Sequence, residues 1–330
     1  MQVIVNQQPC EFDSDTVPLC AVLDTRGVPE SGVAVALNGQ VVPRATWPKV
    51  FLSDGDRLEL VKVVAGGADA GDELVIAGRA FHSRLFMGTG RFISPAVMRA
   101  ALDASGTEMV TVAIRTTGVD GSGPDAGILG ALHRDRYQLL PNTAGATTVR
   151  RAVFMAELAR EALGTNWVKL EVIGDERTLW PDVGGTVEAT RILVDEGFVV
   201  LPYTTTDLVT ALRLEEAGAA TVMPLGSMIG SGQGVKDWEG IRRIVERVSV
   251  PVVVDAGIGT PSDAVLAMEV GASACLINTA VSRSDNPPTM AAAMRHAVVA
   301  GRLAYLAGRM PVSDSAVPSS PSGGLVGATA

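Results

Sequence analysis

Aromatic residues are scarce in this chain. Phe, Trp and Tyr make up only 4% of the 330 residues, whereas 47% of the residues are hydrophobic. The core must therefore be built from Val, Ala, Leu and Ile, a composition typical of a parallel sheet covered by helices. This balance predicts an α/β protein.

Cysteine and histidine are also rare, and neither forms a cluster. The three cysteines, Cys10, Cys20 and Cys275, are far apart and form no CxxC pair, so the sequence indicates neither a zinc site nor a disulfide framework. The three histidines are isolated and lack the spacing of metal ligands. We expect no metal, no cofactor and a reducing compartment, the cytoplasm.

The chain has fewer basic than acidic residues, and its sequence contains no long apolar run. The chain has 27 Lys and Arg against 36 Asp and Glu, a net charge of −9, which argues against a nucleic-acid partner. No apolar run approaches the roughly 18 residues that a membrane span needs. The start, "MQVIVNQQPCEFDSD", lacks the basic region of a signal peptide. We therefore expect no membrane association.

The N-terminal part of the chain has the pattern of a small β-grasp domain. Residues 2–6 alternate as a strand, and residues 16–27 have helical spacing that ends at a glycine. Asn38-Gly39 is a strong hairpin signal, and residues 54–64 read as a turn followed by a strand. The segment "AGGADAGD" that follows, residues 65–72, is small and polar, so it is the predicted domain boundary.

After this boundary, short apolar runs alternate with helical patterns. The eight runs lie at 84–88, 109–114, 137–142, 167–172, 198–203, 221–225, 251–257 and 274–280. Helix candidates lie at 94–106, 147–164, 207–218, 237–248 and 261–271, and a final one at 287–308. Eight strands alternating with helices favour a (β/α)8 barrel of the TIM type, with a doubly wound open sheet as the alternative. The predicted organisation is a β-grasp domain at 1–67, a linker at 68–72, a barrel at 73–308 and a flexible tail at 309–330.

Polar residues at the ends of two predicted strands are the candidates for catalysis. In "WVKLEVIGD", Lys169 and Glu171 face one side while Val168, Leu170 and Val172 face the other. A lysine with a lowered pKa could form a Schiff base with a carbonyl substrate, and a neighbouring carboxylate could move the protons. The alternative is a Lys–Glu pair that serves only as a polar plug.

Asp255, at the end of the seventh predicted strand, is another carboxylate at this rim. Its alternative role is that of an N-cap-like residue that orders the glycine-rich turn after it.

Two glycine-rich turns indicate an anion site. They are "LGSMIGSGQG" at 225–234 and "DAGIGTPSD" at 255–263, and the second opens a helix at Pro261 or Ser262. Glycines allow backbone N–H groups to approach a phosphate closely, and a helix N-terminus adds a favourable dipole. Asn278 and Thr279 could complete the contacts, or they could only cap a turn. The polar segment 115–127 is either a flap over the site or a plain surface loop.

The ordered motifs resemble a known family. "FHSRLFMGTGRF", "LLPNTAG", "WVKLEVIGD", "VMPLGSMIGSGQG", "VPVVVDAGIGTPSDAVLAMEVGA" and "LINTAVS" are similar to blocks of the thiazole synthases of thiamine biosynthesis, over residues 81 to about 305. Residues 36–67 resemble the sulfur carrier protein of the same pathway through its diglycine, Gly66-Gly67.

The resemblance implies a sulfur-incorporating transferase. Such an enzyme makes the thiazole phosphate from 1-deoxy-D-xylulose 5-phosphate, dehydroglycine and sulfur from a carrier thiocarboxylate, and it works as a homo-oligomer, a tetramer. Lys169 matches the lysine that forms the imine with the ketose, and Glu171 and Asp255 match the acid/base carboxylates. The residues that match the sugar-phosphate contacts are Gly230, Ala256, Gly257, Asn278 and Thr279. The chain departs from the family at Thr116, often an arginine, and at Ala146, often a cysteine, so we expect its loop contacts to the substrate to differ from those of the family.

The diglycine raises a chemical difficulty. A carrier and its adenylating enzyme need a free carboxylate at Gly67, but here an amide bond joins Gly67 to Ala68. Either the chain is cut after Gly67, or the fused domain only docks while a separate carrier supplies sulfur. Two other functions stay open: a Schiff-base aldolase-like phosphosugar barrel, and a carrier or docking protein with vestigial catalysis.

Overall fold

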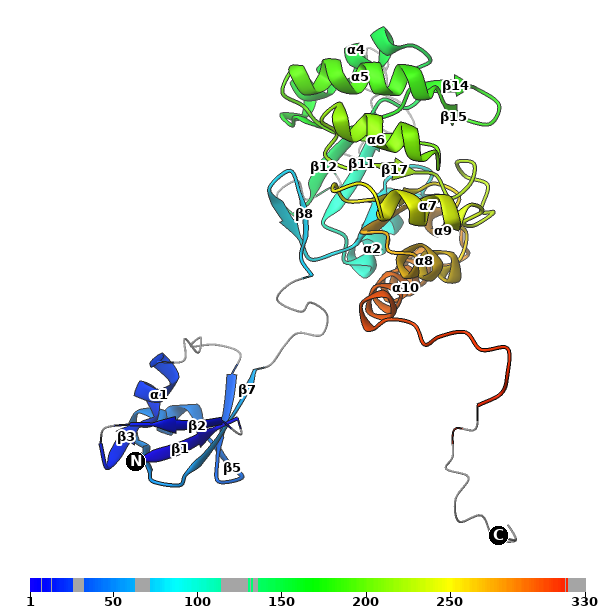
Figure 1. Ribbon diagram of the computed structural model, residues 1–330. Helices are drawn as coiled ribbons and strands as arrows, with labels where there is room; N and C mark the ends of the chain where they lie inside the picture. The colour runs from blue at the N-terminus through cyan, green and yellow to red at the C-terminus, as the bar shows by residue number, and fades with distance from the viewer. Residues whose placement is uncertain are drawn as a thin grey trace, which may run out of the picture. The chain divides into compact units, whose positions relative to one another are not determined.

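A computed structural model describes residues 1–6, 8–12, 14–25, 33–62, 72–113, 130, 132, 136–317 and 319. The chain divides into two compact units, Met1–Asp72 and Glu73–Ala330 (Figure 1). The predicted linker at 68–72 and tail from 309 stay predictions. The diglycine and the segment 115–127 lie outside the described residues.

The first unit is the predicted β-grasp domain. Its sheet has the order β2-β1-β7-β4-β5, in which β1 and β7 pair in parallel and the other neighbours are antiparallel. The strands are β1 (Gln2–Val5), β2 (Gln8–Glu11), β4 (Val33–Leu37), β5 (Gln40–Val42) and β7 (Arg57–Lys62). The other elements are β3 (Thr16–Pro18), which pairs with β6 (Phe51–Ser53), the helix α1 (Leu19–Thr25) and a 3-10 helix, η1 (Arg44–Lys49).

Local sequence explains the central hairpin of this unit. Asn38 and Gly39 join β4 to β5 with φ of 51° and 79°, the left-handed values that a two-residue hairpin turn requires. Leu19 and Val22 on α1 pack against Val3 on β1 and Leu58 on β7. The unit thus has its own apolar core.

The second unit contains the eight expected strands, so the barrel prediction is confirmed. They are β10 (Leu85–Gly88), β11 (Met109–Ala113), β12 (Gln138–Asn142), β13 (Trp167–Leu170), β16 (Val199–Thr204), β17 (Met223–Pro224), β18 (Val253–Asp255) and β19 (Ala274–Ile277). All pair in parallel in the order β17-β16-β13-β12-β11-β10-β19-β18. Parallel bridges from Val222 to Val252 and from Leu225 to Asp255 join the two ends of this order and close the barrel.

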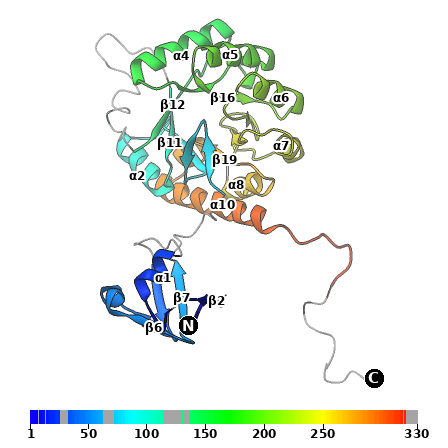
Figure 2. The same cartoon turned by 60° about the vertical axis from the view of Figure 1, so that its left-hand side comes forward.

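Helices surround this sheet (Figure 2). They are α2 (Pro95–Ser105), α4 (Val149–Leu163), α5 (Val183–Asp195), α6 (Leu208–Glu216), α7 (Trp238–Val245), α8 (Pro261–Glu269), α9 (Thr279–Ser282) and α10 (Pro287–Ala307). α5 is absent from the helix candidates named above, because Gly184 and Gly185 in its first turn weaken the helical signal.

Side chains alternate between the inside and the outside of the barrel. Val168 and Leu170 on β13 face outward into a cluster with Ala152 of α4 and Ala189 of α5. Trp167 faces inward. This is the alternation that the sequence predicts for this strand.

A hairpin that the sequence did not reveal closes the N-terminal end of the barrel. It consists of β8 (Leu74–Ile76) and β9 (Arg79–Phe81), joined by Ala77 and Gly78 with positive φ. Phe81 contacts Phe86 and Trp167, each with a distance of 5.9 Å between ring centroids. Side chains therefore fill this end of the barrel, and the C-terminal ends of the strands are the place to look for a site.

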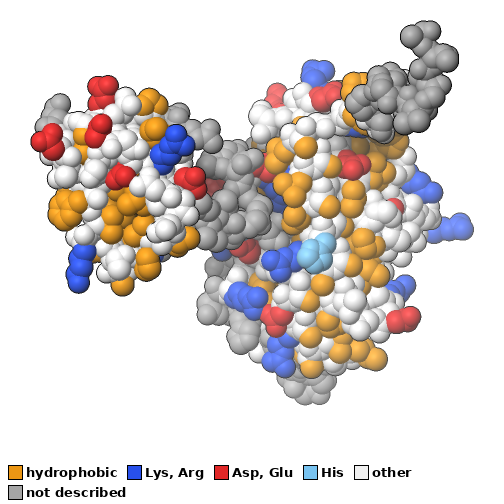
Figure 3. Space-filling model, turned by 90° about the horizontal axis from the view of Figure 1, so that it is seen from below, with side chains coloured by type: hydrophobic (Ala, Val, Ile, Leu, Met, Phe, Trp, Pro, Cys, Tyr) orange, Lys and Arg blue, Asp and Glu red, His pale blue; other side chains and the backbone are white. Residues whose placement is uncertain are grey.

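No helix among the described residues is long and apolar enough to cross a membrane. On the face drawn in Figure 3, Lys and Arg side chains lie singly or in small groups rather than in one continuous patch. That face offers no extended basic surface of the kind that binds a phosphate backbone.

Candidate active site

Three charged side chains meet inside the barrel, near the C-terminal ends of its strands. Lys169 Nζ lies 2.5 Å from Asp255 Oδ2 and 3.4 Å from Glu171 Oε1. The exposed fractions are 6% for Lys169, 5% for Glu171 and 2% for Asp255. Because β13 and β18 are separated by two other strands in the barrel, Lys169 and Asp255 meet across the interior.

The backbone at Glu171 is held by the side chain of Thr143, which directly follows the neighbouring strand β12. The Thr143 hydroxyl donates to the Glu171 carbonyl oxygen and accepts from the Glu171 N–H, both at 2.8 Å. Asp255 is not an N-cap, because Thr260 has that position on α8. Lys169 and Glu171 together with Asp255 therefore form one buried cluster, and not a two-residue plug.

The pKa of Lys169 is shifted in the direction opposite to the one considered from the sequence. Burial alone would lower the pKa of Lys169, but the carboxylates of Asp255 and Glu171 outweigh it and raise this pKa above its usual value. The pKa of Lys169 is therefore raised and not lowered, because two carboxylates face one amine, which the sequence did not show. Burial also raises the pKa of Glu171; Lys169 opposes this rise and Asp255 adds to it.

Tyr203 on β16 belongs to the same site and was missed by sequence reasoning. Its ring centroid lies 5.7 Å from Lys169 Nζ, close enough for a cation–π interaction. The Tyr203 hydroxyl donates to the carbonyl of Leu179 at 3.3 Å. Leu179 lies between the short strands β14 (Ile173–Asp175) and β15 (Trp180–Pro181), so Tyr203 ties this hairpin to the lysine. One feature of the sequence could have indicated Tyr203. It lies two residues after Leu201 on the same strand, and Leu201 faces inward, so Tyr203 must face inward as well.

The two glycine-rich turns pack directly on each other. A Cβ on Gly257 would lie 2.1 Å from Ser227 Oγ and 2.4 Å from Ser227 N, and one on Gly259 would lie 2.5 Å from the Gly232 carbonyl oxygen. Gly234 N–H donates to the Gly257 carbonyl at 2.8 Å. Only glycine permits so close an approach of two backbones.

The predicted phosphate residues adjoin these turns. Ala256, next to Asp255, has a φ of +68°, which is rare outside glycine and marks a strained turn at this rim. The Cα of Gly230 faces α9, because a Cβ there would lie 3.8 Å from Thr279 Oγ1. The structure thus brings Gly230, Gly257 and Thr279 to the same end of the barrel as Lys169.

Helix α8 starts at Pro261, as predicted, but its N-terminus is already capped. The Asp263 carboxylate accepts from the N–H groups of Gly259 at 3.0 Å and Thr260 at 2.9 Å. These two amides are therefore engaged within the turn.

Two asparagines at the strand ends have unused acceptors. The Oδ1 atoms of Asn142 and Asn278 are buried and have no hydrogen-bond partner among the described residues. Asn278 precedes α9, but its side chain makes no capping bond. It packs over Gly88, where a Cβ would come within 2.6 Å of it. Both asparagines are suited to contact a bound polar molecule.

Other candidates stay apart from the cluster. Ala146 is buried, and its carbonyl oxygen accepts a hydrogen bond from Ile173 N–H at 2.7 Å. It therefore contacts the start of the β14–β15 hairpin. Thr116 lies outside the described residues. Among the residues that the structure covers, no three His, Cys, Asp or Glu side chains gather in a way that could hold a metal.

Comparison with known proteins agrees with this architecture. The family model described as thiazole biosynthesis protein ThiG matches residues 75–321, and that of the ThiS family matches residues 3–67. A thiazole synthase from Paramagnetospirillum magneticum is 44% identical over 327 residues, which cover 99% of this chain and 100% of that protein. A thiazole synthase from a Methylobacterium species is 58% identical over 259 residues, 78% of this chain and 96% of that protein.

Among solved structures, the crystal structure of the Amycolatopsis orientalis BexX/CysO complex contains a similar chain. It aligns with a TM-score of 0.66 and 37% identity, over 73% of this chain and 98% of that chain. The barrel fold, the family models and the relative that matches the whole length lead to one conclusion. The chain belongs to the thiazole synthase family and carries a ThiS-family domain in front of its barrel.

Proposed function

We propose that the barrel makes thiazole phosphate from 1-deoxy-D-xylulose 5-phosphate, dehydroglycine and carrier-bound sulfur, through an imine on Lys169. The observation that carries this proposal is the buried cluster of one amine and two carboxylates at the open end of the barrel. A plain structural plug would not need two acids around one lysine, because one partner already compensates its charge.

The cluster supports each proton transfer of imine formation. Lys169 passes one ammonium proton to Glu171, 3.4 Å away, and the neutral amine adds to the ketose carbonyl carbon. The carbonyl oxygen takes up protons from the cluster and leaves as water, while the nitrogen lone pair forms the C=N bond. The raised pKa of Glu171 suits it to hold the transferred proton.

The glycine turns support recognition of the phosphate end of the ketose. In this proposal the amides around Gly230, Ala256 and Gly257 face the phosphate, and Asn278 and Thr279 complete the contacts. The turn that contains Ala256 and Gly257 starts directly after Asp255, the partner of Lys169, which favours this because one molecule could then reach both groups.

Sulfur delivery involves the ThiS-family domain in one of two ways. Either cleavage after Gly67 frees a carboxylate that an adenylating enzyme activates, or the fused domain docks while a separate carrier brings the sulfur. Tethering would raise the local carrier concentration to about the millimolar range when the linker can span the sites. The proposal includes a tetrameric assembly in the cytoplasm.

Reductive trapping tests the imine. Borohydride added with the ketose phosphate is expected to leave a stable adduct on Lys169, identified by peptide mass spectrometry. Lys169→Ala abolishes the adduct, whereas Lys236→Ala is the matched lysine control. A folded wild-type protein that traps no adduct at Lys169 would contradict the proposed mechanism.

Trapping alone does not separate this enzyme from an aldolase-like barrel. Thiazole formation that depends on a sulfur-loaded carrier is the discriminating measurement. If Lys169→Ala left thiazole formation untouched, the barrel would be a docking scaffold.

Intact mass spectrometry of protein from its own cells distinguishes the two sulfur routes. A cut after Gly67, with sulfur on the fragment, supports the cleaved carrier. A full-length chain together with thiazole synthesis from a separate carrier supports docking.

A further inference from the structure

An unpartnered side-chain oxygen lies beside Lys169. Asn142 ends β12 and stands in register with Lys169 on the neighbouring strand β13. Residues in register on paired strands point to the same side of a sheet, and Leu140, two residues before Asn142, packs inside the barrel. The Asn142 side chain therefore faces the interior. Its Oδ1 atom is buried and accepts no hydrogen bond from a described residue.

The chain fixes the position of Asn142 without using its side chain. The next residue, Thr143, donates its N–H to the Lys169 carbonyl at 3.2 Å, and its hydroxyl bonds to the backbone N–H and carbonyl of Glu171. The backbone at Asn142 is thus held beside both residues of the cluster on β13. A buried acceptor without a donor costs free energy of folding, so it calls for a bound molecule that supplies the donor.

We infer that Asn142 Oδ1 accepts a hydrogen bond from the ketose hydroxyl next to the reacting carbonyl, an inference that rests on the proposed function. In that function the carbonyl carbon is bonded to Lys169 Nζ. Because Asn142 lies one strand away, about 5 Å, its amide is closest to the two carbons on either side of the carbonyl. In 1-deoxy-D-xylulose 5-phosphate one of them is a methyl group and the other carries a hydroxyl. Only the hydroxyl can donate, so Asn142 is a specificity-determining residue.

This contact should select against a ketose that lacks the hydroxyl. Such an analogue, a 1,3-dideoxy-ketose phosphate, excludes water from Oδ1 but offers no donor in its place. A site built to bond a hydroxyl rejects the analogue without it, because the buried polar group is left unpaired. We expect the wild type to bind the analogue at least about tenfold more weakly than the hydroxylated ketose.

Calorimetric titration of the full-length protein with both ketose phosphates tests the contact. Asn142→Ala is expected to bind the hydroxylated ketose about tenfold more weakly and to lose the preference between the two ligands. Asn166→Ala is the matched control, because Asn166 directly precedes β13, at its other end, and donates to the Gly197 carbonyl at 3.1 Å. It should keep the full preference. An equally strong preference in Asn142→Ala and wild type, the result expected if only water met Oδ1, would overturn the inference.

Stability separates this role from a structural one. Asn142→Leu removes the unpaired oxygen from a buried position and keeps a similar volume. It is therefore expected to leave the denaturant midpoint unchanged or to raise it, while the preference for the hydroxylated ketose is lost. A lower midpoint would assign Asn142 a structural role and overturn the inference.

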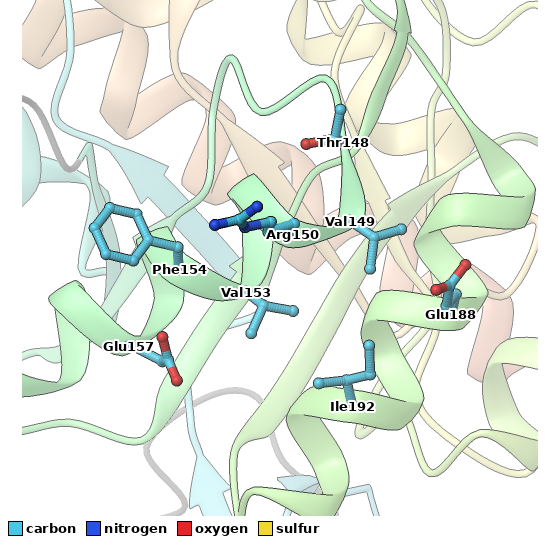
Figure 4. Close-up of a pocket in the computed structure, with 8 residues that line it drawn as sticks. All are labelled: Thr148, Val149, Arg150, Val153, Phe154, Glu157, Glu188 and Ile192. Carbon is cyan, nitrogen blue, oxygen red and sulfur yellow. The ribbon is translucent and has the colours of Figure 1, made fainter.

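Binding at another hollow of the barrel unit must be distinguished from binding at this site. An open groove of about 580 Å3 lies on the outer surface between α4 and α5 (Figure 4). Arg150 is the basic residue among its described lining side chains, and it could attract a phosphate. Arg150→Ala is expected to leave both dissociation constants unchanged, because Asn142 and Lys169 face the interior of the barrel. Loss of binding in Arg150→Ala would place the ketose in the groove and overturn the inference.

Borohydride trapping keeps this test apart from that of the reaction. An adduct at Lys169, together with an equal ligand preference in wild type and Asn142→Ala, would sustain the imine and reject the role of Asn142. If the wild type traps no adduct, the proposed reaction fails, and the titrations alone still decide whether Asn142 recognises the hydroxyl.

Discussion

Burying one ammonium beside two carboxylates leaves an excess negative charge at the centre of the barrel. Asp255 is the closer partner of Lys169, and Glu171 is the acid whose pKa burial raises. These facts assign different tasks to the two acids. In the proposed mechanism Asp255 compensates the ammonium, and Glu171 exchanges a proton with it.

Replacing Lys169 tests this charge balance, because the replacement changes the free energy of unfolding. Lys169→Met leaves two buried carboxylates without a cation, which is expected to destabilise the barrel by about 3–5 kcal/mol at neutral pH. Without Lys169 to oppose burial, the pKa of Glu171 lies further above that of the unfolded chain, so the folded state binds a proton more tightly. Stability is therefore present at low pH and lost as pH rises, and the penalty is larger at pH 8 than at pH 5.

Denaturant unfolding at the two pH values measures this penalty. Lys236→Met is the control, because Lys236 lies outside the cluster and its loss should change stability by only about 0.5 kcal/mol at either pH. A penalty for Lys169→Met that does not vary with pH would contradict the assignment.

The pH dependence of catalysis tests Glu171. The glutamate must be ionised to accept the lysine proton, so the rate of imine trapping falls as pH drops through its pKa. Because that pKa is raised, the acid limb should lie above the ordinary value of about 4.3. Glu171→Gln removes this limb and slows trapping by about 10²–10⁴-fold, whereas Glu171→Asp keeps the limb. An unchanged acid limb in Glu171→Gln would assign the proton transfer to another group.

Part of this cluster could be predicted from the sequence. The period of two along "WVKLEV" placed Lys169 and Glu171 on one side of the strand, and the structure confirms it. The direction of the lysine pKa could not be predicted, because it depends on Asp255, which lies 86 residues further along the chain and across the barrel. Tyr203 was missed for the same reason.

At the scale of elements, the two glycine turns act as one unit. Gly257 sits in the left-handed region, and a Cβ on it would lie only 2.4 Å from the backbone nitrogen of Ser227. Gly257→Ala adds strain of about 1–2 kcal/mol and also pushes the turns apart. We expect the KM for the ketose phosphate to rise at least about tenfold, the equivalent of about 1.4 kcal/mol.

Gly197→Ala is the matched control for this prediction. Its φ of +82° is close to the +78° of Gly257, but nothing lies within 4 Å of a Cβ there. The control should lose only the stability that the backbone strain accounts for and should keep its KM. Equal effects of both variants on KM would show that strain, and not the contact between the turns, controls binding.

Whether a strand can be predicted from the sequence depends on its length. The eight barrel strands form short apolar runs, and all eight were located. The hairpins β8–β9 and β14–β15 have strands of two or three residues, too short for alternation to stand out. Their roles, closing one end of the barrel and holding Tyr203 at the other, come from tertiary contacts.

At the scale of the whole molecule, the two units have separate cores. The core of the first is formed by residues between Met1 and Leu60, and the clusters of the second begin at Leu74. Cooperative unfolding follows shared burial, so the chain should not behave as one two-state system.

We therefore expect two unfolding transitions in denaturant. The denaturant slope grows with the surface exposed on unfolding, so the transition of the first unit, with 72 residues, should be the shallower one. Trp47 reports on this unit and Trp167 on the barrel, because each is buried in the core of its own unit. Comparing the fluorescence of wild type and Trp47→Phe isolates the signal of the first unit.

Deleting residues 1–72 provides the control for this experiment. The deletion should remove the shallow transition and leave the barrel transition at the same denaturant concentration, with Lys169 still trapped by borohydride in the presence of the ketose phosphate. A single transition that moves when the first unit is deleted would instead mean that the ThiS-family domain stabilises the barrel. In that case its retention in the chain would have a structural reason, independent of whether Gly67 ever carries sulfur.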